Sequence, residues 1–198
     1  GSDEILALLA RAYAGPGDEI LFGEPAFVMY PIFALSVGAT PVKASEPNFT
    51  VSVDSLLSKV TERTRIVYVA NPNNPTGTML NSDEMSRLRA GLRKDILLVI
   101  DAAYAEYVIR DDYSPGIDLV DAGENVVMTR TFSKIYAMGG ARLGWAYCPE
   151  AVCEVINRIR PPFNVTSGAQ AAGIAAVNDV EFMNRSRNHN TEWLPWLS

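Results

Sequence analysis

The sequence has few of the residues from which many metal and nucleophile sites are built. Its 198 residues include one histidine, His189, and two cysteines, Cys148 and Cys153. His189 lies in a polar stretch and is interpreted as an ordinary surface residue, and a metal site would need more ligands than these three side chains, so we expect no metal site. Two cysteines separated by four residues are typical of free thiols in a reducing cytoplasm. We therefore expect a cytoplasmic protein.

Long apolar runs and an excess of positive charge are also missing. No run reaches the roughly 18 apolar residues of a membrane span, and no signal peptide opens the chain. The net charge of −6 argues against nucleic acid or an anionic membrane as the main partner. No strand-like run is followed by Gly-x-Gly-x-x-Gly, which disfavours a Rossmann dehydrogenase. The 48% apolar content predicts one soluble domain with a large core.

Lysine is scarce as well, and one of the four lysines differs from the others. Lys43, Lys59 and Lys94 lie near predicted turns or on polar helix faces. Lys134 follows the strand-like run 126–128 and lies among hydroxyls, glycines and aromatic residues. A lysine in such a place can form an imine with an aldehyde cofactor. The alternative is a surface lysine at a junction between strand and loop.

Anion-binding groups surround Lys134 in the sequence. The hydroxyls of Thr131 and Ser133 can hydrogen-bond a phosphate, and Arg142 can bind it through a bidentate charge-assisted contact. Together with Lys134 they indicate a site for a phosphorylated aldehyde.

Three strand-like runs end in polar residues. Residues 66–70 lead into the Asn-Pro-rich loop 71–77, residues 96–100 lead into Asp101 and Tyr104, and residues 126–131 lead towards Lys134. In open α/β sheets the carboxyl ends of the strands meet at one edge, where ligands bind. An Asn, an acid, a Tyr and a Lys are therefore expected to converge on one crevice.

Apolar strands alternate with amphipathic helices along the chain. This predicts an α/β three-layer sandwich, a mainly parallel sheet with helices on both faces. Ser2 is expected to cap a first helix, with Asp3 and Glu4 in its first turn. Further helices are predicted at about 28–37, 53–60, 82–91, 150–159 and 167–177, and strands at 20–22, 40–43, 66–70, 96–100, 126–131 and 143–147.

The order and spacing of these motifs resemble the fold-type-I family of pyridoxal-phosphate (PLP) enzymes, most closely the histidinol-phosphate aminotransferases. The matching stretches are 1–4, 24–30, 71–77, 101–107, 129–145 and 160–165. Ala102 stands where many relatives carry Glu, and residues 137–139 replace a commoner Gly-Leu-Ala. Neither departure touches the named chemistry.

The resemblance implies a catalytic group of three residues. Lys134 would form the imine with PLP and then move a proton, and Asp101 would hold the proton on the pyridine nitrogen. Tyr104 and Asn74 would hydrogen-bond the phenolic oxygen of the cofactor. The alternatives are a helix cap or ion pair for Asp101, core packing for Tyr104 and an Asx-turn for Asn74.

Phosphate binding is implied at the start of the first helix. The backbone amides of Ser2 and Asp3 would form an anion site. Thr131, Ser133 and Arg142 would complete the phosphate cup.

Three further roles complete the resemblance. Phe27 would stack on the pyridine ring, although a core aromatic residue at a helix start is the alternative. Asn164 lies in a stretch that resembles the substrate-side loop of the family. Asn71 and Asn73 are expected to be turn residues.

The implied function is transamination of histidinol phosphate with 2-oxoglutarate in histidine biosynthesis, carried out by a homodimer. Residues 1–198 are interpreted as the PLP-binding large domain, without the amino-terminal arm and the carboxyl-terminal small domain of the family. Alternatives are an aromatic or broad-range aminotransferase, a PLP decarboxylase or lyase, and a non-catalytic PLP-binding or dimerisation fragment.

Overall fold

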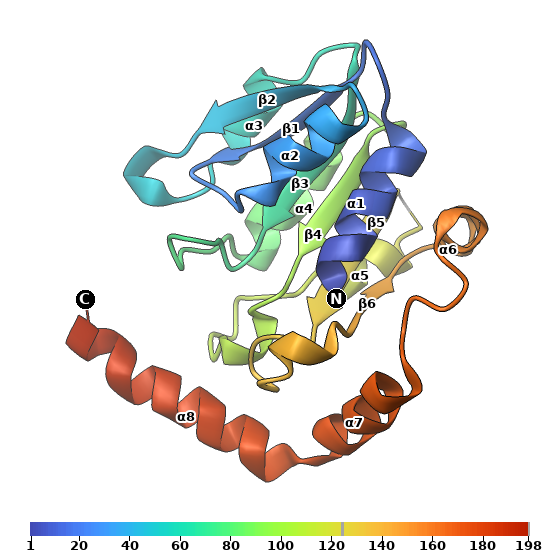
Figure 1. Ribbon diagram of the computed structural model, residues 1–198. Coiled ribbons are helices and arrows are strands. Elements are labelled where there is room, and N and C mark those ends of the chain that lie inside the picture. Colours follow the sequence, from blue (N-terminus) through green and yellow to red (C-terminus); the bar gives the residue numbers. More distant parts are fainter. Residues whose placement is uncertain (124, 198) are drawn as a thin grey trace.

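A six-stranded sheet lies at the centre of the computed structural model, which describes residues 1–123 and 125–197 (Figure 1). Its strands are β1 (Glu19–Glu24), β2 (Thr40–Ser45), β3 (Thr64–Ala70), β4 (Leu97–Asp101), β5 (Val126–Thr131) and β6 (Gly144–Tyr147). They lie side by side in the order β2-β1-β3-β4-β5-β6. All neighbouring pairs are parallel except β6, which runs antiparallel to β5. The predicted fold class, a mainly parallel sheet between helices, is confirmed.

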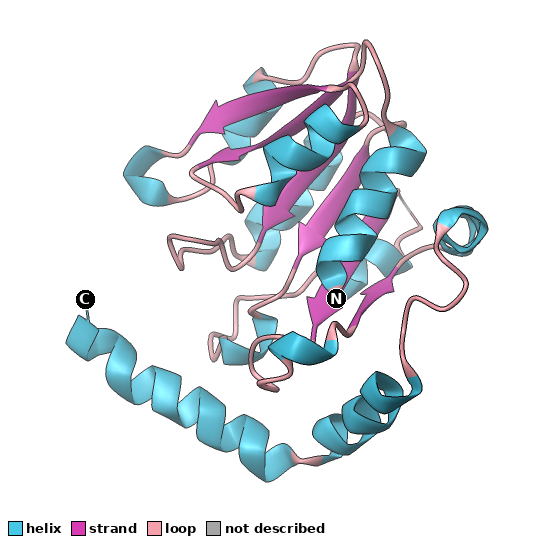
Figure 2. Ribbon diagram, in the orientation of Figure 1, coloured by secondary structure: helices cyan, strands magenta, loops and turns pink. Residues whose placement is uncertain are grey.

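Helices cover both faces of the sheet because the central strands are apolar on both sides. In β3, Ile66 and Tyr68 face one core, whereas Val67 and Val69 face the other. The first core lies under α1 (Ser2–Tyr13), α2 (Met29–Ser36) and α6 (Glu150–Ile159). The second lies under α3 (Val53–Ser58), α4 (Ser82–Gly91) and α5 (Ile117–Asp121), on the far side of the sheet in Figure 2.

Two helices at the carboxyl-terminal end extend away from this three-layer body (Figure 1). They are α7 (Ser167–Asn178) and α8 (Val180–Leu197), and α8 is joined to the body where Arg187 Nε donates to the carbonyl of Glu106, 2.7 Å away. Ser198, the last residue of the predicted domain range, lies outside the described residues. Over residues 1–123 and 125–197, no helix is both long enough and apolar enough to cross a membrane.

The structure differs from the sequence-based expectation at the helix ends and in α8, an 18-residue helix that is not among the helices expected above. Ser2 does not cap the first helix: it is the first helical residue, Gly1 takes the cap position, and no side chain bonds there. At α4 the cap is Asn81, whose side chain accepts from the amide of Glu84. The short helix α5 and the 3₁₀ turns η1 (Pro47–Phe49), η2 (Ala105–Tyr107) and η3 (Gly139–Ala141) have no apolar periodicity long enough to reveal them.

The parallel arrangement brings distant segments to one edge of the sheet. The loops after β1, β3, β4 and β5 all leave from this edge. Since β6 is antiparallel, its first residue lies at the same edge, and so does the start of α1, because Gly1 N donates to the carbonyl of Arg142 at 2.7 Å. Gly144 permits this approach: a Cβ there would lie 2.3 Å from Ser2 N and 3.0 Å from the Arg130 carbonyl oxygen.

Gly144→Ala is expected to lower the free energy of unfolding by about 1–3 kcal/mol, because backbone atoms of two segments would have to move apart. Gly140→Ala is the matched control, since a Cβ at Gly140 meets no atom within 4 Å. Urea unfolding of the two variants and the parent measures the difference. Equal stability of the two variants would contradict the close contact between α1 and β6.

Candidate active site

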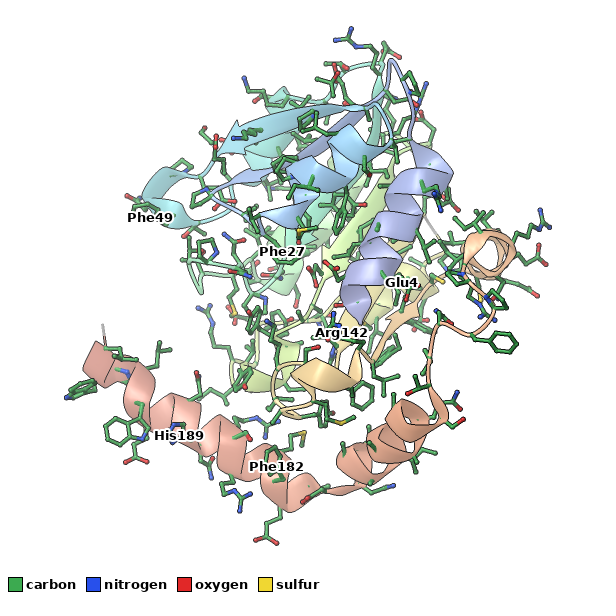
Figure 3. The ribbon with its side chains drawn as sticks, viewed as in Figure 1. Glu4, Phe27, Phe49, Arg142, Phe182 and His189 are labelled. Atoms are coloured by element: carbon green, nitrogen blue, oxygen red, sulfur yellow. The ribbon has the colours of Figure 1, made fainter. Side chains whose placement is uncertain are left out.

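A cavity of about 160 Å³ opens at the carboxyl edge of the sheet. All ten residues that were predicted to bind the cofactor line this cavity, namely Ser2, Asp3, Phe27, Asn74, Asp101, Tyr104, Thr131, Ser133, Lys134 and Arg142. Ala70, Pro72 and Ala103 complete the lining. Figure 3 labels two of these side chains, Phe27 near the start of α2 and Arg142 below the amino-terminal end of α1.

Lys134 lies in the turn that follows β5. The turn is closed by two backbone hydrogen bonds from Phe132 N to the Leu143 carbonyl, 3.1 Å, and from Met138 N to the Phe132 carbonyl, 3.0 Å. The side chain of Lys134 is exposed, and its Nζ lies 5.1 Å from the ring centre of Tyr104. An amine held above an aromatic ring at the cavity mouth is accessible to an incoming carbonyl group.

Asp101 is the buried acid of the cavity, at the last position of β4. Tyr30 donates to its Oδ2 at 3.0 Å, and Thr129 donates to its Oδ1 at 3.3 Å. Burial raises the pKa of the Asp101 carboxyl above its ordinary value. The two hydroxyl donors, the amide of Ala103 and the charge of Lys134 act in the opposite direction. A cationic ligand group beside Asp101 would stabilise the ionised form further.

Tyr30 positions Asp101, a role that is not among those predicted from the sequence. Its ring stacks on Tyr68 with 4.9 Å between centroids and an 8° interplanar angle, and Phe27 packs edge-on against it at 5.6 Å. Tyr30 is fully buried, and its place in the apolar run of α2 is typical of a core residue. Its hydroxyl was the only signal, because a buried phenol needs a hydrogen-bond partner.

An anion-binding cup forms between β5, η3 and α1. Arg142 Nη1 lies 3.3 Å from Ser133 Oγ and donates to the Gly139 carbonyl at 2.7 Å. The amide of Ser133 donates to Thr131 Oγ1 at 3.1 Å. Ser2 and Asp3 are the first two residues of α1, and amides at a helix start have no preceding turn to bond and favour negative charge.

The Asn-Pro-rich loop is held by two of its three asparagines and presents the third to the cavity. Asn71 exchanges hydrogen bonds with the backbone of Leu80, with its Nδ2 3.1 Å from the Leu80 carbonyl and its Oδ1 2.9 Å from the Leu80 amide. Asn73 Nδ2 donates to the Pro25 carbonyl at 2.9 Å. Asn74 lies between them and Gly77 in the chain and lines the cavity.

Asn164 does not lie in this cavity. It lines a neighbouring cavity of about 200 Å³ between α1, β6 and α6, and its Oδ1 accepts from Arg160 at 3.3 Å. Arg142 lines both cavities. The thiols of Cys148 and Cys153, both free, also face the second cavity.

Comparison of the sequence with known proteins identifies one family and close relatives. The family model of aminotransferase class I and II matches residues 1–194. Histidinol-phosphate aminotransferase of Paramagnetospirillum magneticum is 63% identical over 198 residues, which are all of this chain and 54% of that protein. The protein of the same name from Ruegeria sp. is 52% identical, again over the whole chain and 54% of its own length. The chain thus spans about half the length of the curated relatives it matches.

Solved structures give the same picture. Histidinol-phosphate aminotransferase from Sinorhizobium meliloti in complex with pyridoxal-5'-phosphate matches with a TM-score of 0.89 and 27% identity, over 94% of this chain and 51% of that one. Aspartate aminotransferase from Thermus thermophilus with maleate matches with a TM-score of 0.86 and 25% identity, over 97% of this chain and 51% of that one.

Tyr30→Phe is expected to cost about 1–3 kcal/mol of unfolding free energy, because Asp101 Oδ2 would stay buried without its donor. This decrease in unfolding free energy should become larger as the pH rises. The raised pKa of Asp101 means that its stabilising contribution is complete below the unfolded-state value near 3.8 and is lost as the pH rises through the folded-state value. Removing a donor raises that pKa further.

The matched control is Tyr68→Phe, which removes a buried hydroxyl bonded to the Leu6 carbonyl at 2.7 Å and leaves the Asp101 donors in place. Urea unfolding between about pH 4 and 7 measures both variants. The decrease in unfolding free energy caused by Tyr68→Phe should not depend on pH. If the decrease caused by Tyr30→Phe is also constant with pH, the role of Tyr30 at Asp101 is contradicted.

Proposed function

The chain belongs to the class I and II aminotransferase family, and from this premise we propose that the complete protein transfers the amino group of histidinol phosphate to 2-oxoglutarate with PLP. The observation that supports this most is the convergence of Lys134, Asp101 and Arg142, from three separate segments, on one cavity. Similarity to proteins named histidinol-phosphate aminotransferase supports the choice of amino donor.

PLP is the cofactor of this family, and the cavity has the groups that such a molecule needs. The cup around Arg142 suits its phosphate, and Asp101 suits its ring nitrogen. Tyr104 and Asn74 can bind its phenolic oxygen, and Phe27 offers an aromatic face to its ring. When bound, PLP supplies an electron sink that stabilises negative charge at the substrate α-carbon.

The residues of the chain supply binding, orientation and proton transfer. The amine of Lys134 is the group that holds the aldehyde of PLP and then carries a proton to and from the substrate α-carbon. Asp101, fixed by Tyr30 and Thr129, keeps a proton on the ring nitrogen. Arg142, joined to Ser133, anchors the phosphate so that the reacting end stays near Lys134.

Three further proposals concern the protein as a whole. Residues 1–198 form the PLP-binding large domain, supported by the three-layer body and its cavity. The protein is a homodimer, supported by exposed apolar side chains such as Val28, directly before α2, and Leu35 on α2, which are 67% and 65% exposed. It acts in the cytoplasm, where the free thiols Cys148 and Cys153 stay reduced.

Borohydride treatment in the presence of PLP is expected to fix the cofactor covalently on Lys134 as a secondary amine. Peptide mapping by mass spectrometry locates the adduct among the four lysines. The matched variant is Lys134→Arg, which keeps the positive charge and should give no adduct. An adduct on Lys43, Lys59 or Lys94 in the parent would contradict the assignment.

Histidinol phosphate is expected to be the best amino donor with 2-oxoglutarate. Its phosphate allows a charge-assisted contact whose absence costs about 2–4 kcal/mol, so kcat/KM for phenylalanine and aspartate should be lower by on the order of 10²-fold or more. Steady-state assays of the complete protein with the three donors measure this. A preference for phenylalanine would favour an aromatic aminotransferase. Cofactor binding without turnover of any donor would favour a binding domain.

A further inference from the structure

Glu46 is a buried carboxyl for which the proposed reaction gives no direct role. It follows β2, its residue is 9% exposed, and its Oε1 is buried without a hydrogen-bond partner. Gly23 of β1 makes room for it, since a Cβ on Gly23 would lie 1.8 Å from Glu46 Oε1. The carboxyl therefore occupies space that a side chain on the neighbouring strand would fill.

The other oxygen of Glu46 is bonded to the Asn-Pro-rich loop. Asn73 Nδ2 lies 3.1 Å from Glu46 Oε2, 2.9 Å from the Pro25 carbonyl oxygen and 3.0 Å from Thr76 Oγ1. Asn73 thus joins the segments that follow β1, β2 and β3. Phe27 comes two residues after Pro25, and Asn74 directly follows Asn73, and both line the cofactor cavity.

This cluster has more acceptors than hydrogens. The two Nδ2 hydrogens of Asn73 serve three oxygen atoms, while Asn73 Oδ1 and Glu46 Oε1 have no donor. An ionised Glu46 would add negative charge and no hydrogen. Protonation of Glu46 turns one of its two acceptor oxygens into a donor. The cluster is short of donors, so the protonated form suits it better.

Within residues 1–123 and 125–197, no charged group compensates an ionised Glu46. On β1 and β2 the nearby charged side chains are Glu24 and Lys43, which are paired with each other at 2.5 Å. The loop 71–80 and the turn η1 carry no charged residue. Burial alone raises the pKa of Glu46 to about 7.

We propose that Glu46 is a positioning residue of the cofactor cavity, which in its neutral form braces Asn73 and so keeps Asn74 and Phe27 in place. On ionisation the carboxylate must take up water or swing outward, and Asn73 loses its brace. Cofactor binding then weakens as the pH rises through neutrality. This inference rests on the proposed PLP chemistry only for the identity of the ligand.

The direction of the pH effect follows from the raised pKa. The folded protein keeps Glu46 protonated up to about pH 7, whereas the unfolded chain ionises near 4.5. The stabilising contribution of Glu46 is therefore complete below about pH 4.5 and is lost as the pH rises to about 7. Above that pH the difference between parent and a neutral variant should level off.

Glu46→Gln is the decisive variant, because glutamine keeps the acceptor for Asn73, adds a donor and cannot ionise. Glu154→Gln is the matched control, an exposed carboxyl on α6 that pairs with Arg158 and not with Lys43. Gly23→Ala is a second variant, because its methyl group would displace the Glu46 carboxyl without changing its chemistry.

Two measurements report whether Glu46 holds Asn73 and the loop in place. The first is the dissociation constant of PLP, followed by absorbance from about pH 5.5 to 8.5. The second is hydrogen exchange of the backbone amides in residues 71–80 without cofactor, corrected for the intrinsic effect of pH. The amides of Asn73 and Gly77, bonded to the Thr78 and Asn73 carbonyls at 2.8 and 2.9 Å, are the most direct probes.

The parent and Glu154→Gln should lose PLP affinity by on the order of tenfold between pH 6 and 8, relative to Glu46→Gln. Over the same range their loop amides should lose protection, while those of Glu46→Gln stay protected. Gly23→Ala should show weak binding and fast loop exchange already at pH 6.

Loop exchange and PLP affinity that change with pH equally in the parent and in Glu46→Gln would overturn the proposal. So would a Gly23→Ala variant with the loop protection of the parent. If no protein binds PLP, the proposed function fails, but loop exchange still decides whether Glu46 braces Asn73.

Discussion

The burial of the Asp101 carboxylate is the constraint around which this edge of the sheet is organised. An ionised carboxyl without partners in the interior is too costly to persist, so each neighbour must supply a donor or a positive charge. Tyr30 and Thr129 supply hydroxyls, and Lys134 supplies charge. This requirement links α2, β5 and the turn after β5 to the end of β4. The same acid, placed in a cavity, is suited to hold a cationic ring nitrogen.

The groups that touch the cavity could be predicted from the sequence because two rules act together. Apolar runs identify the strands, and in a parallel sheet the residues after those runs share one edge. Asp101 follows such a run directly, and Lys134 and Asn74 come three and four residues after one, so their residue types alone indicate the chemistry of the site. Asn164 follows no strand, and the structure places it in the neighbouring cavity. Local rules of this kind predict the residues that line the cavity but not the residues that support them from behind.

The supporting residues could not be predicted, because only the third dimension decides their burial. Tyr30 lies in an apolar helix, and nothing in the sequence aims its hydroxyl at a strand that begins more than sixty residues later. Glu46 follows an exposed edge strand, where a carboxylate is normally solvated. It is buried because Gly23 on the neighbouring strand has no side chain. The Ser2 cap failed for a simpler reason: the helix begins one residue earlier than the serine would require.

The supporting residues also explain how one part of the cavity can be rigid while another responds to conditions. Asp101 and Thr131 are strand residues, held by the ladder of the sheet. Phe27 and Asn74 lie on loops, so their positions depend on neighbours that never meet the ligand. A neutral amide could brace Asn73 as well as Glu46 does, without responding to pH. Using a buried carboxyl for the same task makes the order of the loop depend on a proton. It does so near neutral pH because, in the part of the chain that the structure describes, no cation lies close enough to keep Glu46 ionised.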